Sequence, residues 1–311
     1  MSSLSRKLPF RATILLMLKN QKVLVSGAEY FTDQFAINAQ MDSSIEVNHD
    51  KAIAEHNSIR RALISLGIDV IKSEAPPDLQ DGVYTANWAL TRGNIALMSR
   101  LPNKRKGEEA YALKYLQALG FKTVTLPDYV KSFSGQGDAL PCGDIVFTQS
   151  PYRTSKEAHP FLKSVLNYNK VMSLRTMPSR DSRFSRPKKN LITGWPDSPT
   201  YDIDLALAVL KWPDAGKKGL IAWCPQVFTF GSRLALKRLK DVDKIEVSKE
   251  EAMTVFALNL VSTGEAVLMN SGAPKFQAQI EAAGLKVITL DLPELKKGGG
   301  SIRCTTLTLD N

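Results

Sequence analysis

The stretch Gln279-Ile280-Glu281-Ala282-Ala283-Gly284-Leu285-Lys286-Val287-Ile288-Thr289-Leu290 joins the end of a helical pattern to a short strand rich in β-branched residues. Gly284 stands between the two, where a left-handed C-terminal helix cap is expected. Related stretches occur four more times, at residues 61–72, 115–126, 161–174 and 234–247. Five copies of one helix-to-strand unit indicate a repeated architecture.

Each copy is preceded by one or two further runs with the character of a strand. These runs are Lys22 to Ser26, Gly82 to Ala86 with Ile95 to Ser99, Asp144 to Thr148, Leu220 to Cys224, and Ala266 to Asn270. The repeat is therefore strand, strand, helix and strand, with a period of about 50 to 60 residues, which favours an α/β fold with units arranged around an axis. A doubly wound α/β sheet is the alternative. The segment from Met177 to Pro199 is predicted as the longest loop.

Composition bounds the classes of function. A chain of 311 residues with 43% hydrophobic content can bury a sizeable core. The formal charge of +10 would suit an anionic partner, but the basic residues are scattered and cluster only locally. No basic stripe interleaved with aromatic residues is present, which argues against nucleic-acid binding.

The three cysteines, Cys142, Cys224 and Cys304, are widely spaced, without a Cys-x-x-Cys pair or a cluster of histidines. The sequence therefore predicts no disulfide framework, no metal site and no cofactor, and it fits a reducing compartment.

Residues 1–20 are predicted as an N-terminal extension, and residues 21–311 as a single domain. In the extension, three basic residues, Arg6, Lys7 and Arg11, precede the apolar run Ala12 to Leu18. This run is far too short to span a membrane. We expect a cytoplasmic protein that does not enter a membrane, and the basic extension leaves an organellar presequence as the alternative.

The chain closes on Gly298-Gly299-Gly300-Ser301-Ile302-Arg303-Cys304, followed by the Thr- and Leu-rich run to Leu309. Glycines let a backbone approach a ligand closely, and the alternating run predicts a strand that begins at the cysteine. Cys304 is therefore a candidate nucleophile, with a small buried hydrophobic residue as the alternative.

Polar residues recur at similar places in successive units, where strand ends and loops would face a central pocket. They are Asp81 and Asn87, the set Ser134-Gly135-Gln136-Gly137-Asp138, Arg153, and the pair Asp202 and Asp204. The alternate acids Asp202 and Asp204 would share one face of a strand, or act as caps if they began a helix.

Taken in order with the closing cysteine stretch, these motifs resemble the pentein superfamily, which includes dimethylarginine dimethylaminohydrolases, arginine deiminases and amidinotransferases. The resemblance extends from about Lys22 to Leu309. It implies an α/β propeller of five strand-strand-helix-strand units around a pseudo-fivefold axis.

The resemblance also implies a reaction. In that family a cysteine thiolate attacks a guanidinium carbon, an amine leaves, and water hydrolyses the covalent thiouronium adduct. Cys304 would be the nucleophile and Asp81 a ligand of the guanidinium, while Asn87 stands where several members carry a second acid. The other implied substrate ligands are Asp138 and Asp204 for the cation, and Arg153 and Arg105 for a carboxylate.

Two positions depart from the family pattern. Asp202 stands where the family has its proton-transferring histidine, and Ser134 stands where a glutamate supports that histidine. A carboxylate beside Cys304 would raise the pKa of the thiol, where an imidazolium would lower it. Loss of general acid–base assistance costs about 10²- to 10⁴-fold in rate. Asp202 could compensate in part as a proton acceptor, so it is the second predicted catalytic residue.

Three functional hypotheses remain. The first is an enzyme, a guanidino C–N hydrolase or amidinotransferase acting on arginine or a substituted arginine. The second is a protein on the same fold that binds cationic guanidino ligands without turnover. The third is a structural or interaction role with a vestigial pocket. The expected partner is a small cationic ligand, without nucleic acid or membrane, and the resemblance is compatible with a homodimer.

Overall fold

The computed structural model describes residues 19–311 except 183 and 215. The basic and apolar parts of the predicted N-terminal extension lie outside the described residues. Within the described residues, no helix combines the length and the apolar character that a bilayer crossing requires.

Five three-stranded sheets form the body of the protein. In each sheet the middle strand pairs antiparallel with one neighbour and parallel with the other. Four sheets are β3 (Ala89–Arg92), β4 (Ile95–Met98) and β5 (Lys122–Val124); β6 (Ala139–Cys142), β7 (Ile145–Gln149) and β8 (Lys170–Leu174); β9 (Leu207–Lys211), β10 (Gly219–Trp223) and β11 (Val242–Glu246); and β12 (Val261–Ser262), β13 (Ala266–Asn270) and β14 (Lys286–Leu290).

The fifth sheet joins the two ends of the described chain. Its middle strand β1 (Lys22–Val25) runs parallel to β2 (Asp69–Lys72) and antiparallel to β15 (Leu307–Thr308). The register pairs Val23 with Thr308. The predicted five units and their order are therefore confirmed, and the doubly wound alternative is wrong, because the sheets are five separate ribbons.

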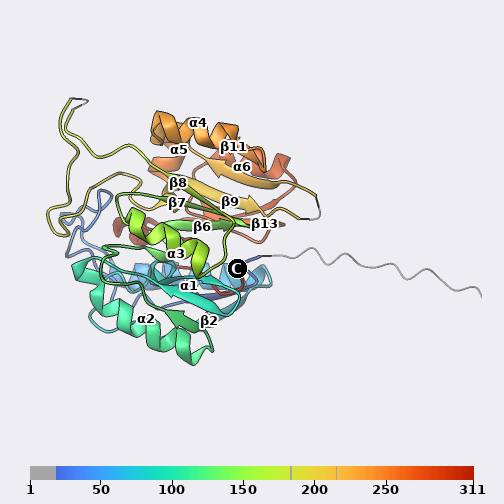
Figure 1. The fold of residues 1–311 in the computed structure, drawn as a ribbon. Coiled ribbons are helices and arrows are strands. Elements are labelled where there is room, and N and C mark those ends of the chain that lie inside the picture. The colour runs from blue at the N-terminus through green and yellow to red at the C-terminus, as the bar shows by residue number, and fades with distance from the viewer. Residues whose placement is uncertain (1–18, 183, 215) are drawn as a thin grey trace, which may run out of the picture.

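A helix connects each parallel pair of strands and lies on the outside. These helices are α1 (His49–Ser65), α2 (Lys106–Ala118), α3 (His159–Ser164), α4 (Phe230–Arg238) and α6 (Pro274–Ala282). Two short helices, α5 (Lys249–Thr254) and α7 (Pro293–Lys297), lie in connections between sheets. In Figure 1, α4 lies at the top edge and α2 at the bottom edge of the view, with strands between them.

Glycines end three of these helices as predicted. Gly67, Gly120 and Gly284 have φ angles of +78°, +89° and +78°. A side chain at these positions would be strained by the left-handed backbone, although it would meet no atom within 4 Å. The repeated helix–glycine–strand pattern therefore reflects the left-handed backbone conformation that these helix ends need.

One predicted strand, Gly82 to Ala86, is absent, and the C-terminal strand is wrong in extent. Residues 82–88 form turns and a 3₁₀ segment (Thr85–Trp88), because Thr85 Oγ1 bonds to the carbonyls of Leu24 and Thr305, each at 3.0 Å. The C-terminal strand includes only Leu307–Thr308 and not Cys304. Residues 301–306 are curled by hydrogen bonds from the Thr305 and Thr306 amides to the Ser301 and Arg303 carbonyls.

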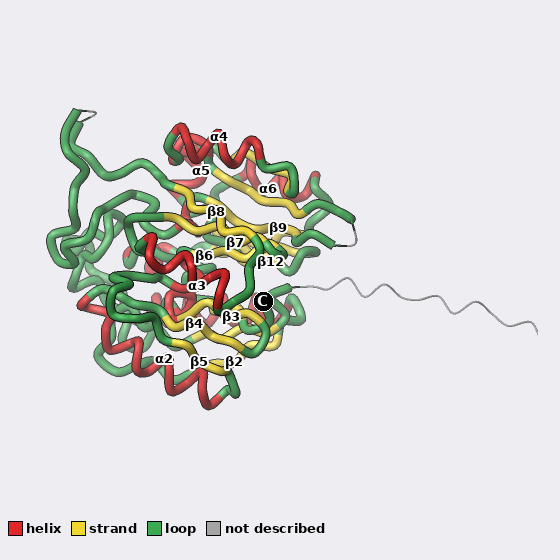
Figure 2. The backbone as a smooth tube through the Cα atoms, viewed as in Figure 1, coloured by secondary structure: helices red, strands yellow, loops and turns green. Residues whose placement is uncertain are grey.

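The inner strands β3, β6, β9 and β12 were not recognised from the sequence. They are almost wholly buried, so apolar residues do not alternate with exposed polar ones along them. The predicted loop is confirmed, since residues 177–199 contain no helix or strand among the described positions. This segment extends from the body in Figure 1 and is drawn in green in Figure 2.

The pairing of β15 with β1 generates a prediction. Leu307 is fully buried and packs with Leu24, Trp88 and Met98. Leu307→Ala should lower the free energy of unfolding by about 2 to 5 kcal/mol, because it removes apolar contacts and leaves a cavity at the closing strand. Denaturant unfolding followed by circular dichroism measures the change. Leu191→Ala is the matched control, because Leu191 is 99% exposed, and equal effects of the two changes would contradict the prediction.

Candidate active site

The glycine-rich loop that carries Cys304 is held by side chains from three other segments. Tyr84 donates its hydroxyl to the Leu295 carbonyl at 2.6 Å, and Tyr201 donates to the Gly299 carbonyl at 2.8 Å. Asn38 Nδ2 donates to the Gly298 carbonyl at 3.1 Å. A Cβ atom on Gly298 would lie 2.3 Å from the Tyr84 hydroxyl oxygen. The close approach of these side chains therefore requires glycine.

Cys304 is 2% exposed, and its sulfur lies between two polar side chains. The thiol donates to Asp204 Oδ2 at 3.2 Å and accepts from Asn259 Nδ2 at 3.1 Å. Burial raises the pKa of the thiol well above its usual range, and the carboxylates of Asp204 and Asp202 raise it further. The thiol is therefore protonated at neutral pH until something offsets these negative charges.

Three buried carboxyl groups cluster near this thiol. Asp138, Asp202 and Asp204 each have one oxygen with no hydrogen-bond partner among the described residues. Their pKa values are raised, chiefly by burial and for Asp138 and Asp204 also by the nearby Asp202 charge. The guanidinium groups of Arg153 and Arg105 oppose this rise for Asp202, and that of Arg303 opposes it for Asp204, but burial outweighs them. Protons or a bound cation can therefore add positive charge that stabilises the cluster.

Asp202 is oriented by the two neighbours that the sequence placed in the same site. Its Oδ2 accepts from Asn87 Nδ2 at 2.8 Å and from Ser134 Oγ at 3.3 Å. Gly137 leaves the space for this contact, since a Cβ there would lie 2.3 Å from Asn87 Nδ2 and 2.9 Å from Asp202 Oδ2. Asp202 precedes a 3₁₀ segment (Ile203–Leu205) and makes no capping hydrogen bond with its side chain.

Asp81 lies beside Tyr84 at the start of the segment that ends at Trp88. Gln80 Nε2 donates to Asp81 Oδ2 at 2.9 Å. Burial raises the pKa of Asp81 to about 6, and the Arg105 guanidinium opposes that rise. Asp81 is therefore a further acid that carries its proton more readily than an exposed aspartate.

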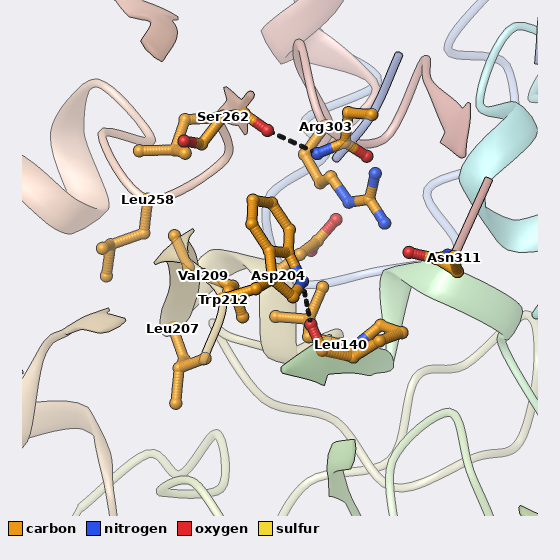
Figure 3. Close-up of a pocket in the computed structure, with 13 residues that line it drawn as sticks. Leu140, Asp204, Leu207, Val209, Trp212, Leu258, Ser262, Arg303 and Asn311 are labelled. Carbon is orange, nitrogen blue, oxygen red and sulfur yellow. Dashed lines mark hydrogen bonds between the residues drawn. The ribbon is translucent and has the colours of Figure 1, made fainter. Parts of the chain in front are cut away.

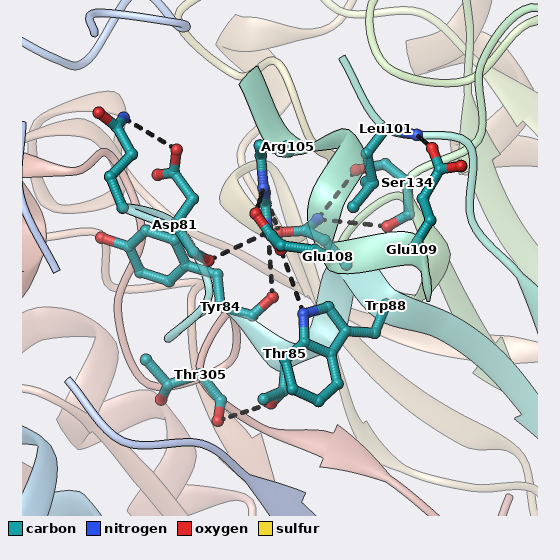
Figure 4. Close-up of polar contacts among 12 residues, drawn as sticks. Asp81, Tyr84, Thr85, Trp88, Leu101, Arg105, Glu108, Glu109, Ser134 and Thr305 are labelled. Atoms are coloured by element: carbon teal, nitrogen blue, oxygen red, sulfur yellow. Dashed lines mark hydrogen bonds and ion pairs between the residues drawn. The ribbon is translucent and has the colours of Figure 1, made fainter. Parts of the chain in front are cut away.

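Arg105 is fully engaged with protein groups (Figure 4). Its Nε and Nη2 each donate to Glu108 at 2.7 Å, and Nη1 donates to Asn87 Oδ1 at 3.0 Å. Nη2 also reaches the Asp81 carbonyl at 3.2 Å. Glu108 was missed in the sequence, where its only signal is the i,i+3 spacing from Arg105. The buried pair braces the segment that carries Asp81 and Asn87.

Arg153 is 5% exposed and makes no ion pair with any described residue. Its Nη2 donates to the Ile37 carbonyl at 2.8 Å, and its guanidinium carbon lies 4.9 Å from the centre of the Tyr201 ring. A buried guanidinium without a carboxylate is suited to an anionic group of a ligand.

A small cavity lies on another side of Asp204 (Figure 3). Its volume is about 30 Å³, and Arg303, Trp212 and Leu140 also line it. Such a space holds one or two water molecules and is too small for an amino acid. Among the described residues, no group of three or more His, Cys, Asp or Glu side chains is arranged to hold a metal ion.

The three histidines lie away from these groups. His49 bonds to the Glu29 carbonyl, and His56 is buried in the cluster of α1 side chains, where burial lowers its pKa to about 4. His159 begins α3 and is partly buried. No hydrogen bond joins a histidine to Cys304 or to the clustered carboxyl groups.

Solved structures show which fold this chain shares. The N-terminal domain of ArgZ, a cyanobacterial arginine dihydrolase whose mutant was crystallised with substrate, matches with a TM-score of 0.79 at 23% identity, over 93% of this chain and 98% of that one. A dimethylarginine dimethylaminohydrolase adduct matches with a TM-score of 0.68 at 19% identity, over 94% and 100%. The fold is thus that of the pentein superfamily.

Sequence comparison narrows the class. The model of the family "N,N dimethylarginine dimethylhydrolase, eukaryotic" matches residues 28–172. The N(G),N(G)-dimethylarginine dimethylaminohydrolase of Mycobacterium tuberculosis is 32% identical, over 94% of this chain and 86% of that protein. The bifunctional arginine dihydrolase/ornithine cyclodeaminase AgrE of Nostoc sp. is 26% identical, over 94% of this chain but 38% of that protein. The chain belongs to the dimethylarginine dimethylaminohydrolase family.

The brace, which is the buried ion pair of Arg105 and Glu108, generates a prediction for stability. Glu108→Gln should lower the free energy of unfolding by about 3 to 5 kcal/mol, because it leaves the buried Arg105 without a counter-charge. Glu109→Gln, at the next position, should cost less than about 1 kcal/mol, because its ion pair with Lys106 is partly exposed. Chemical denaturation of both variants measures the difference. A Glu108→Gln protein as stable as Glu109→Gln would contradict the role of the brace.

Proposed function

We propose that the protein hydrolyses a C–N bond in the guanidino group of arginine or an N-substituted arginine, with Cys304 as the nucleophile. One observation carries the proposal: a buried thiol on a glycine loop contacts the buried Asp204 and lies near the buried Asp202, and each of these carboxyl groups has an oxygen that lacks a partner. A planar cation with several N–H donors would satisfy those oxygens. The family to which the chain belongs supports the same substrate class.

The substrate is positioned by charge at both ends. The guanidinium binds among Asp81, Asp202 and Asp204, whose carboxyl groups have raised pKa values in the empty site. We assign the carboxylate of the substrate to Arg153, because Arg105 is already occupied by Glu108. This assignment gives Arg105 a supporting role in place of the substrate contact that the sequence suggested.

The first chemical step needs an ionised Asp204 and a protonated Asp202. In the empty site the charge of Asp202 raises the pKa of Asp204, so the bound guanidinium has to draw the proton from Asp204 to Asp202 before this step. Asp204 Oδ2, which lies 3.2 Å from the sulfur, takes the thiol proton as Sγ bonds to the guanidinium carbon. The C–N bond then breaks, and the departing nitrogen takes the proton of Asp202 and leaves as an amine. A thiouronium adduct on Cys304 remains, with its positive charge delocalised over two nitrogens.

Water completes the reaction. It adds to the adduct carbon and gives one proton to the Asp202 carboxylate, the C–S bond breaks, and a ureido product forms. The sulfur takes back the proton held on Asp204, and the remaining proton protonates the released amine. Catalysis is slower than with a histidine by about 10²- to 10⁴-fold, since a buried carboxyl transfers protons less readily near neutral pH.

A second candidate function is binding of a guanidino cation without turnover. The raised pKa of the thiol, together with carboxylates rather than an imidazole beside it, favours this candidate. An amidinotransferase is a variant of the first function in which an amine, and not water, attacks the adduct. The two experiments below separate these outcomes.

Activity is tested by measuring ureido product and released amine from arginine, monomethylarginine and dimethylarginine. The intact protein should form product, and Cys304→Ser should reduce the rate by at least about 10³-fold, because the hydroxyl is a far weaker nucleophile. Cys142→Ser is the control, since Cys142 is buried in a separate core cluster. If the intact protein forms ureido product no faster than Cys304→Ser, the proposed hydrolysis is contradicted. Transfer of the amidino group to an added amine would identify a transferase.

Binding is tested by its coupling to protons. The raised pKa of Asp81 leaves this carboxyl group protonated at low pH, and a bound guanidinium favours its ionised form. Ligand binding should therefore release protons, and affinity for arginine should rise as pH increases from about 5 through the pKa of Asp81, about 6.

Calorimetry of Cys304→Ser with arginine in buffers of different ionisation enthalpy counts those protons. Asp81→Asn should release fewer of them, because one titrating group is gone. Binding that is independent of pH and buffer would contradict the proposed cation site, whether or not turnover occurs.

A further inference from the structure

Asn259 is fully buried and bonds to both the backbone and the sulfur of the Cys304 segment. Its Oδ1 accepts from the backbone amides of Ser301 at 3.1 Å, Arg303 at 3.0 Å and Cys304 at 3.2 Å. Its Nδ2 donates to Cys304 Sγ at 3.1 Å. One side chain thus shapes the curl of residues 301–304 and touches the atom that the curl presents.

The orientation of this amide group follows from the same contacts. Three backbone N–H groups converge on Oδ1, and they require an acceptor. If the amide were turned over, its NH₂ group would face those three donors. Nδ2 must therefore point toward the sulfur, and the thiol receives a hydrogen bond whatever its protonation state.

Asn259 is itself held in a rigid turn. The backbone amide of Asn259 donates to the Phe256 carbonyl at 2.9 Å, and the same carbonyl accepts from Asn270 Nδ2 at 3.2 Å. Asn270 Oδ1 in turn accepts from Ser301 Oγ at 2.7 Å. Phe256 has a φ angle of +51°, an uncommon conformation for a bulky residue. The turn and the Cys304 segment are thus joined through two asparagines, only one of which reaches the sulfur.

We propose that Asn259 is a positioning residue that sets the reactivity of Cys304 by stabilising its thiolate. The sulfur lies between an acceptor, Asp204, and a donor, Asn259. When the thiol proton passes to Asp204 Oδ2, negative charge develops on Sγ, and the Nδ2–H hydrogen bond becomes charge-assisted and stronger. Asn259 exchanges no proton and forms no covalent bond in this step.

This role matters because burial and two carboxylates work against ionisation of the sulfur, and among the nearby charged groups the buried Arg303 guanidinium favours it. Asp204 and Asp202 raise the pKa of the thiol, and burial does the same. Asn259 provides a neutral donor that favours the thiolate without repelling a cationic substrate. The inference rests on the proposed nucleophilic role of Cys304, but it can be tested without turnover.

The test compares two isosteric changes, Asn259→Asp and Asn270→Asp. In Asn259→Asp the carboxylate can still accept from the three backbone amides, but the donor to sulfur is lost and a negative charge is added. Iodoacetamide labelling of Cys304 in the full-length protein, followed by mass spectrometry between about pH 6 and pH 10, measures the thiolate. We expect the midpoint to rise by about one pH unit or more, and the rate at pH 8 to fall at least about ten-fold.

Asn270→Asp is the matched control, because it alters the same network without touching the sulfur. Its midpoint should rise by less than that of Asn259→Asp, because its added charge does not contact the sulfur and the donor to the sulfur is kept, even if its melting temperature falls. Asn259→Ala, which removes the donor without adding charge, should shift the midpoint in the same direction by less. This variant keeps the test decisive if Asn259→Asp does not fold, as judged by circular dichroism.

Three results would overturn the proposal: unchanged midpoints in the folded Asn259 variants, an equal shift in Asn270→Asp, or a thiol that resists labelling over the whole range in the unchanged protein. Product assays on the same preparations show separately whether the hydrolase function holds. A shifted midpoint without turnover would support the role of Asn259 and reject hydrolysis.

Discussion

The antiparallel pairing of β1 with β15 is the interaction on which the rest of the structure depends. It joins the two ends of the described chain and closes the ring of five sheets. The Cys304 loop immediately precedes β15, so closure also brings it to the segment Thr85–Trp88, where the Ala86 amide donates to the Cys304 carbonyl at 3.0 Å. Thr85 bonds to both β1 and the Cys304 loop. The pairing that closes the fold therefore also brings the parts of the candidate site together.

Charge imbalance is the second theme of the structure. Burial of Asp81, Asp138, Asp202 and Asp204 is unfavourable unless they are protonated or paired, and only part of their hydrogen-bonding capacity is met by protein groups. Arg105 contributes little to that balance as a ligand, since Glu108 neutralises it. Such a site lowers the folding stability of the empty protein, and in the proposed function it increases the affinity for a cation.

The reactivity of the thiol is set by its two hydrogen-bonding neighbours more than by its exposure. Asp204 can receive the proton, and Asn259 can stabilise the charge that remains. Asp202 lies one step further away, bonded to Asn87 and Ser134, where it can exchange protons with a leaving group. In the proposed reaction, proton transfer is thereby divided between two carboxyl groups and does not depend on one imidazole.

The sequence by itself determined the five units, the glycine caps such as Gly284 and the position of Cys304 beside a glycine loop, because these depend on local backbone requirements and short periodicities. It also indicated Asp81, Asn87, Asp202 and Arg153 as a group. Only the tertiary structure decided that Asp204 contacts the thiol, that Glu108 occupies Arg105, and that Asn259 holds the loop 45 residues further along the chain. Contacts between different units depend on how the ring closes. The spacing of residues within one unit does not determine that closure, so the sequence pattern could not predict these contacts.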